Sequence, residues 1–148
     1  SCRLLRQYFD RPAITTDLIC GFAGETEEEF AETLAMIETA DFSAMHIFPY
    51  SRRSGTVADR MPDQLPNAVK DVRCHQAAAV AAEMEQRYLE RWVGETLPVL
   101  FEEEADGLWR GHAPNYVAVY AAGVDLHNVL KDVKITGLHG QALEGVIL

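Results

Sequence analysis

The sequence has no long apolar run and few cysteines, and each shortage excludes certain classes of protein. No segment approaches the roughly 18 consecutive apolar residues of a membrane-spanning helix. The first residues, Ser1 to Arg6, also lack the apolar stretch of a signal peptide. The cysteines Cys2, Cys20 and Cys74 are odd in number and widely separated, which argues against a disulfide framework or a closely spaced metal motif. We therefore expect a cytoplasmic protein with no membrane partner.

Basic residues are also scarce. The chain carries 13 Lys and Arg against 23 Asp and Glu, a formal net charge of −10 at pH 7. Up to Arg91 there are 15 acidic and 10 basic residues, and beyond it 8 and 3. Non-specific nucleic-acid binding comes mainly from Lys and Arg that neutralise phosphates, so any RNA contact must be local. With 48% hydrophobic residues, the 148-residue chain can bury one moderate core or two small ones.

The first part of the sequence has the residue pattern of an α/β unit. Residues 13–20 are β-branched and apolar, as in a strand buried on both faces, and a glycine turn follows. Thr26 and Glu29 form a capping box that predicts a helix, and residues 43–50 predict a second strand. Two parallel strands joined by a helix are therefore expected. A helix ending before Pro12 and a long one from Pro66 to about Arg91 flank this unit.

From Gly94 onward the residue pattern changes to short strand-like runs separated by glycines. The runs are 97–101, 108–112, 116–120, 133–136 and 142–147. Such spacing indicates a small antiparallel β-barrel. We predict an α/β domain over residues 1–93 and a β-barrel domain over residues 94–148.

The turn after the first strand is one candidate ligand site. Gly21 and Gly24 would let a ligand approach backbone N–H groups beside a helix N-terminus, and Glu25 follows them. Taken alone, a Gly-x-x-Gly turn before a capped helix is more often only a tight structural connection.

The exit of the second strand lies at the same predicted edge. Arg53 has the fork geometry to hold a carboxylate, and Tyr50 can pack against a flat ring, with Ser51 between them. A solvated or ion-paired loop is the alternative for Arg53. We expect His46, inside the strand, to be a satisfied core histidine rather than a catalyst.

Taken together, these segments resemble a known family. GFAGETEEEF, HIFPYSRRSGT, a helix containing Lys70 and Arg73, and a terminal β module follow one another in the order found in the C-terminal part of radical S-adenosylmethionine (SAM) methylthiotransferases. The likeness is greatest to those that modify threonylcarbamoyladenosine beside the tRNA anticodon. It covers nearly the whole chain. Ala23 replaces the proline of the family's GFPGET pattern.

The resemblance implies a partial radical SAM (β/α) barrel that binds SAM along one edge. The implied SAM-binding residues are Gly21, Gly24, Glu25, Tyr50, Ser51 and Arg53. The family holds its SAM-cleaving 4Fe-4S cluster on a C-x-x-x-C-x-x-C motif and a second cluster on an N-terminal domain. The three cysteines here match neither pattern. We therefore expect this fragment to be inactive, to retain no cofactor tightly, and to need the missing N-terminal part of its chain.

The terminal module resembles a TRAM domain, an OB-like barrel appended to RNA-modifying enzymes. The implied tRNA contacts are Arg110, Asn115, Tyr116, Lys131 and Lys134, side chains that stack on bases or bind phosphates in other barrels. The alternative places Tyr116 and Trp109 in the barrel core or an interface. The acidic run Glu102–Glu104 would repel phosphate.

In such an enzyme, reductive SAM cleavage makes a deoxyadenosyl radical that abstracts hydrogen from the adenine before a methylthio group is attached. A methylthiotransferase acting on a ribosomal protein is a second interpretation. A non-catalytic RNA-binding or scaffolding protein is a third. The exposed edge of a partial barrel would also favour self-association.

Overall fold

The computed structural model describes all 148 residues and divides them into two compact units. The first unit comprises Ser1–Leu5 and Ile14–Met84, and the second comprises Arg6–Ala13 and Glu85–Leu148. The domain division predicted at residues 93 and 94 stays a prediction. None of the helices combines the length and the apolar character needed to cross a membrane.

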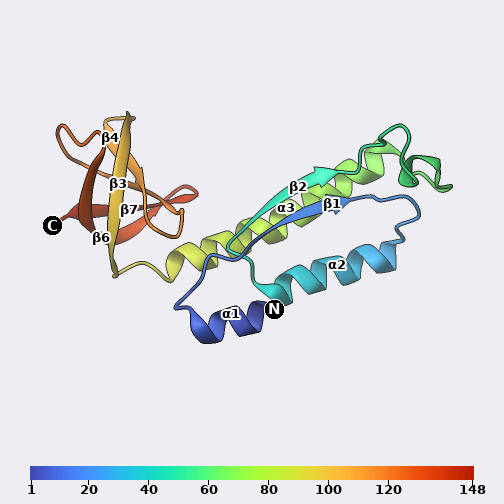
Figure 1. Cartoon of the computed structure of the whole chain (residues 1–148), viewed down its shortest axis with the longest axis horizontal. Helices are drawn as coiled ribbons and strands as arrows, with labels where there is room; N and C mark the ends of the chain where they lie inside the picture. Colours follow the sequence, from blue (N-terminus) through green and yellow to red (C-terminus); the bar gives the residue numbers. More distant parts are fainter. The chain divides into compact units, whose positions relative to one another are not determined.

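Two parallel strands form the centre of the first unit (Figure 1). Strand β1 (Thr15–Cys20) pairs with β2 (Ala44–Pro49), and helix α2 (Glu27–Ala40) connects them. The predicted pair of parallel strands joined by a helix is therefore confirmed. The other helices that precede the barrel are α1 (Cys2–Tyr8), the 3-10 helix η1 (Ala58–Arg60) and α3 (Asn67–Glu90).

Helix α2 begins at the predicted capping box. The Thr26 hydroxyl accepts a bond from the Glu29 N–H at 3.2 Å, and the Glu29 carboxylate accepts one from the Thr26 N–H at 2.9 Å. Two N–H groups that the first turn of a helix leaves unpaired are thereby satisfied. This fixed start positions the turn that precedes the helix.

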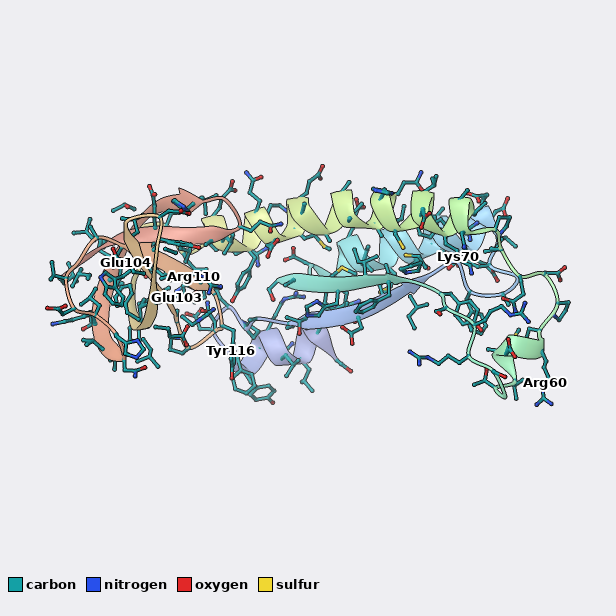
Figure 2. All side chains as sticks on the ribbon, turned by 90° about the horizontal axis from the view of Figure 1, so that it is seen from above. Arg60, Lys70, Glu103, Glu104, Arg110 and Tyr116 are labelled. Carbon is teal, nitrogen blue, oxygen red and sulfur yellow. The ribbon has the colours of Figure 1, made fainter.

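Helices α2 and α3 pack on the same face of the strand pair (Figure 2). Their buried side chains form two clusters: Phe30 and Ala77 pack with Cys20 of β1, and Ile37 and Met84 pack with Phe42. The opposite face is exposed, so the prediction of a strand buried on both faces is wrong for β1. The reason is that no described segment covers that face.

The second unit is a closed five-stranded barrel in the order β3-β4-β5-β7-β6. The strands are β3 (Thr96–Ala105), β4 (Leu108–His112), β5 (Ala118–Ala121), β6 (Val129–His139) and β7 (Ala142–Ile147). Its core contains Phe101, Val119, Val133 and Leu143, together with Trp92. The order is consistent with a TRAM-like, OB-like barrel.

The barrel is not wholly antiparallel, which corrects the prediction. Strand β6 pairs antiparallel with β3, and the β6–β7 hairpin then returns β7 to the free edge of β5. Because β7 runs in the same direction as β5 at that point, these two strands pair in parallel. Closure of the barrel therefore requires one parallel pair.

Candidate functional site

A cleft of about 530 Å³ lies where β1 and β2 end. Carboxyl ends of parallel strands are the usual ligand edge of an α/β sheet. The cleft is lined by Ile19, Phe48, Pro49, Tyr50, Ser51, Arg53, Thr56 and Ala58. Three of the six residues expected to bind SAM therefore lie together here.

The two adjacent arginines of this loop are used differently. The Arg52 side chain bonds to the Asp59 carboxylate at 2.9 Å and to the Asp59 carbonyl at 2.7 Å. The Arg53 side chain lines the cleft and makes no hydrogen bond or ion pair; only its carbonyl is used, by Thr56. Arg53 is therefore the guanidinium that is free to bind an anionic group.

Tyr50 has defined contacts at its backbone and its ring, but none at its hydroxyl. Its N–H donates to the Cys20 carbonyl at 2.8 Å, and its ring meets the Phe22 ring edge-on at 4.9 Å. The Lys70 ammonium donates to the Tyr50 carbonyl at 3.0 Å and lies 5.3 Å from the ring centre. The buried Tyr50 hydroxyl has no partner. An unpaired buried hydroxyl is costly, so a polar ligand group that reached it would relieve that cost.

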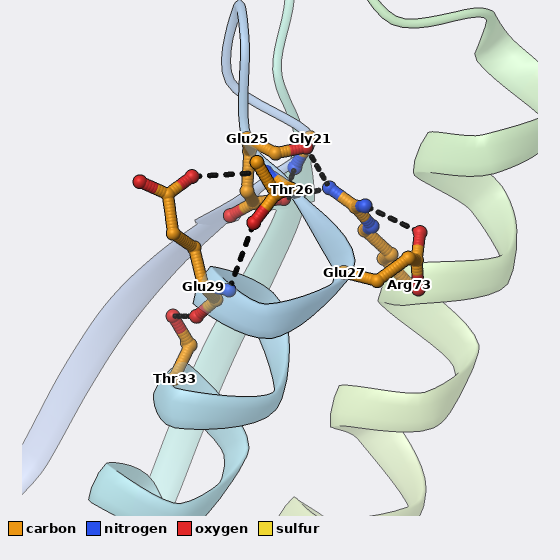
Figure 3. Close-up of polar contacts among 7 residues, drawn as sticks. All are labelled: Gly21, Glu25, Thr26, Glu27, Glu29, Thr33 and Arg73. Atoms are coloured by element: carbon orange, nitrogen blue, oxygen red, sulfur yellow. Dashed lines mark hydrogen bonds and ion pairs between the residues drawn. The ribbon is translucent and has the colours of Figure 1, made fainter.

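Glu25 belongs to the scaffold of the loop rather than to the cleft lining (Figure 3). Its carboxylate accepts bonds from the Gly21 N–H at 2.8 Å and from Arg73 at 2.6 Å. Arg73, which is 2% exposed, also donates to the Glu25 carbonyl and to the Glu27 carboxylate. Burial opposes the charge on Arg73, but the bonds to Glu27 and Glu25 outweigh it and raise the pKa of Arg73.

The two glycines of this loop allow its backbone to adopt left-handed conformations. Gly21 has φ +74°, and a Cβ there would lie 2.5 Å from Cγ of Lys70, so only glycine fits. Gly24 has φ +80° and donates its N–H to the Asp63 carbonyl at 2.9 Å. Neither glycine lines the cleft. The roles predicted for Gly21, Gly24 and Glu25 in SAM binding stay predictions.

The sequence alone assigned no role at this edge to several of its residues. Lys70 and Arg73 are buried charges on α3 that hold the loops after β2 and β1. No local pattern distinguishes them from the exposed charges of a helix. Ile19 and Phe48 also line the cleft, and the two-residue period of a strand is the signal that could have found them.

His46 is exposed, so the prediction that it is a core histidine is wrong. It lies on β2 opposite Asp17 of β1 in the strand register. Its ring stacks near that of Phe48 at 6.5 Å. The position of His46 on the uncovered face explains the difference.

Most residues expected to contact RNA in the barrel are engaged internally. Arg110 pairs with Glu103 at 2.9 Å on the neighbouring strand (Figure 2). Asn115 donates to the Tyr88 hydroxyl at 3.3 Å and accepts from the Val117 N–H. Lys134 donates to the Gly94 carbonyl, and Lys131 is exposed.

Tyr116 differs from these residues. It is 89% exposed and has φ +62°, an uncommon conformation for a bulky residue. The alternative that places Tyr116 in the barrel core is therefore wrong. Trp109 does pack, partly buried, against that core.

The structure contains no group of three or more His, Cys, Asp or Glu arranged to hold a metal ion. Burial, with a further contribution from Cys74, raises the pKa of the Cys20 thiol to about 12.

No protein-family model matches the chain, but individual proteins do. It is 40% identical over 129 residues to the threonylcarbamoyladenosine tRNA methylthiotransferase MtaB of Bacillus subtilis, which covers 83% of the chain and 29% of that protein. It is 41% identical over 112 residues to the ribosomal protein uS12 methylthiotransferase RimO of Heliobacterium modesticaldum, covering 75% and 24%.

A more extensive match than either of these is to the tRNA-2-methylthio-N(6)-dimethylallyladenosine synthase of Chlorobaculum tepidum. It is 35% identical over 147 residues and covers 96% of the chain and 33% of that protein. The chain thus spans about a third or less of the length of these relatives. Because proteins of this one kind match it over most of its length, the chain belongs to the radical SAM methylthiotransferase family.

Proposed function

We propose that this chain is the C-terminal part of a tRNA methylthiotransferase that acts on threonylcarbamoyladenosine by radical SAM chemistry. The observation that carries the proposal is the 40% identity to MtaB over 83% of the chain. The same chain places Tyr50, Ser51 and Arg53 along one cleft at a sheet edge. Residues 1–93 would then be the end of a (β/α) barrel, and residues 94–148 its TRAM domain.

The cleft residues fit SAM. A free guanidinium on Arg53 matches the cofactor's carboxylate, and the unpaired hydroxyl of Tyr50 matches a polar group. When bound with a reduced cluster, SAM supplies the radical chemistry. The residues of this chain would bind and orient it, while Lys70 and Arg73 hold the loops in place. Cys2, Cys20 and Cys74 do not form the family's C-x-x-x-C-x-x-C motif, and this supports placing the 4Fe-4S ligands in another part of the enzyme.

The barrel would supply part of the contact with tRNA. Tyr116 is the strongest candidate, because it is exposed and held in a fixed loop. Unstacked RNA bases commonly stack on such aromatic rings. Arg110, Asn115 and Lys134 would have to exchange their internal partners for RNA.

Action on a ribosomal protein is a second candidate, favoured by the 41% identity to RimO over 75% of the chain. The experiment that separates the two uses the full-length enzyme, reconstituted anaerobically, with three substrates. These are tRNA carrying threonylcarbamoyladenosine, tRNA carrying dimethylallyladenosine, and protein uS12. Mass spectrometry of the products should detect a methylthio group only on threonylcarbamoyladenosine. Modification of uS12 alone would establish the second candidate, and no modification of any substrate would favour a binding protein.

A further inference from the structure

Two of the three cysteines lie in the same buried cluster of the first unit. Cys20 ends β1, is 1% exposed and packs with Ala77, and Cys74 of α3 packs against the same cluster. Cys2 packs against the other cluster, which contains neither of them. All three cysteines are free thiols. Cys20 and Cys74 are therefore the pair that the packing of the first unit brings together.

The spacing of residues along α3 brings Cys74 to the end of β1. Lys70, Cys74 and Ala77 lie four and three residues apart, so they share one face of the helix. At one end of this face the helix backbone comes close to the strand, because a Cβ on Gly21 would lie 3.4 Å from Cα of Lys70. At the other end Ala77 packs with Cys20. Cys74 lies between these two contacts, beside Cys20.

The two thiols interact but differ in their access to solvent. Burial is the main cause that raises the pKa of the Cys20 thiol to about 12, and an electrostatic interaction and a hydrogen bond with Cys74 contribute to the rise. A hydrogen bond between thiols brings their sulfur atoms into contact. Cys20 is buried, whereas Cys74 is partly exposed. An oxidant that enters from solvent therefore meets Cys74 first.

We propose that Cys20 and Cys74 form an oxidative modification site, at which hydrogen peroxide produces a disulfide that ties the end of β1 to α3. In the first step the Cys74 thiolate attacks one peroxide oxygen and the O–O bond breaks. The departing hydroxide takes up the proton that the Cys74 thiol released and leaves as water, so that Cys74 becomes a sulfenic acid.

The second step joins the two side chains. The Cys20 sulfur attacks the Cys74 sulfur, the S–O bond breaks, and the proton of the Cys20 thiol leaves with the hydroxide as a second water. The two thiols together give up two electrons, which reduce one peroxide to two waters. A thiol with so high a pKa holds little thiolate at neutral pH. Contact with Cys74 offsets this scarcity, because a partner held in place reacts at a high effective concentration.

The disulfide would join two elements that hold the ligand edge of the sheet. The Cys20 carbonyl accepts the N–H of Tyr50, which lines the cleft. Arg73, the neighbour of Cys74 on α3, bonds to Glu25 in the loop after β1. Oxidation would therefore fix the strand end below the cleft to the helix that anchors the adjoining loop.

The test treats the full-length enzyme with a small molar excess of hydrogen peroxide under otherwise anaerobic conditions. Free thiols are then blocked with iodoacetamide, and mass spectrometry of the digested protein measures how much of the Cys20 and Cys74 peptides is linked. The variants are Cys74→Ser and Cys20→Ala, with Cys2→Ser as the control. Because Cys20 is buried, circular dichroism checks the fold of Cys20→Ala. Cys74→Ser, at a partly exposed position, gives the test a variant that does not disturb the core.

We expect most of the wild-type protein and of Cys2→Ser to yield the linked peptides, and dithiothreitol to separate them. Cys74→Ser should keep Cys20 reduced, because the oxidant does not reach the buried thiol. Cys20→Ala should accumulate the Cys74 sulfenic acid, which dimedone traps. Oxidation of wild-type Cys74 to a sulfinic acid without a link, or a link from Cys20 or Cys74 to any other cysteine in its place, would overturn the proposal. Linked peptides found only in covalent dimers on a non-reducing gel would overturn it as well.

Discussion

Arg53 and Arg52 provide a matched test of the cleft, because they are neighbours in sequence but only Arg52 is bonded to Asp59. We predict that Arg53→Ala in the full-length enzyme weakens SAM binding about tenfold or more, since a charge-assisted bond to the carboxylate is lost. Arg52→Ala should weaken it much less. Calorimetric titration with SAM measures both. Equal losses, or no loss at Arg53, would remove Arg53 from the site.

Arg73 tests the scaffold under the same edge. Its guanidinium is buried and bonded to Glu25 and Glu27. Arg73→Met should lower the free energy of unfolding by about 3–5 kcal/mol, because Glu25 is left near the interior without its partner. Urea denaturation of this chain measures the change. The control is Arg52→Met, which breaks an exposed pair and should cost less than about 1 kcal/mol.

If Arg73→Met lowered the free energy of unfolding no more than the control does, the Glu25 bond to Gly21 alone would have to hold the loop.

Arg53 and Arg73 also show what the sequence could predict at the scale of single residues. The family pattern identifies Arg53 as a candidate SAM-binding residue. Its guanidinium is unpaired only because Asp59, six residues further along the chain, binds Arg52 instead. The burial of Arg73 depends on the packing of a distant helix against two loops.

At the scale of elements, the loop between β4 and β5 holds Tyr116, the residue that we propose as an RNA contact. Its backbone is pinned by bonds from the Ala113 N–H to the Val117 carbonyl and from the Tyr116 N–H to the Ala113 carbonyl. Tyr116 is thus presented in a fixed left-handed conformation. A rigid aromatic ring loses little conformational entropy when a base stacks on it.

We predict that Tyr116→Ala in the full-length enzyme lowers tRNA affinity by about 1–3 kcal/mol, the usual worth of one stacked base. Tyr116→Phe should keep most of that affinity, because the ring remains. Filter binding at fixed salt measures both. Leu130→Ala is the control, since Leu130 is also an exposed apolar residue of the barrel. Wild-type affinity in Tyr116→Ala would leave the loop without a role in binding.

Local patterns predicted the elements well, since capping, strand period and glycine turns all act over short stretches. The capping box at Thr26 and the parallel β1–β2 pair are examples. The parallel pairing of β5 with β7 could not be predicted in this way. It arises from closure of the whole barrel, which no single strand encodes.

At the scale of the molecule, the segments of each unit are not contiguous. The second unit takes in residues 6–13 and the last turns of α3, where Tyr88 and Leu89 join the barrel core, as does Trp92 just after the helix. Arg11 stacks on Trp92 at 4.2 Å and pairs with Glu95. Composition changes at Gly94, but the packing of the barrel begins earlier along the chain.

That arrangement determines how the role of the barrel in tRNA binding is tested. Deleting the residues from Gly94 onward would uncover Tyr88, Leu89 and Trp92, so the deletion needs a companion in which all three are replaced by polar residues. In the full-length enzyme we predict that both deletions reduce tRNA affinity and leave the Kd for SAM largely unchanged. The reason is that the cleft lies wholly within the first unit.

The isolated barrel should nevertheless bind tRNA poorly. From Gly94 onward the chain carries 8 acidic and 3 basic residues. Two of the basic residues, Arg110 and Lys134, are already bonded to other groups of the barrel. The acidic run Glu102–Glu104 also repels phosphate. A polypeptide that starts at Glu85 keeps the core residues of α3 and should show only weak association that falls further as salt is raised. Tight binding by this polypeptide would mean that the barrel reads RNA by itself. Unchanged tRNA affinity in both deletions would instead make the barrel a structural appendage, with the tRNA held by the rest of the enzyme.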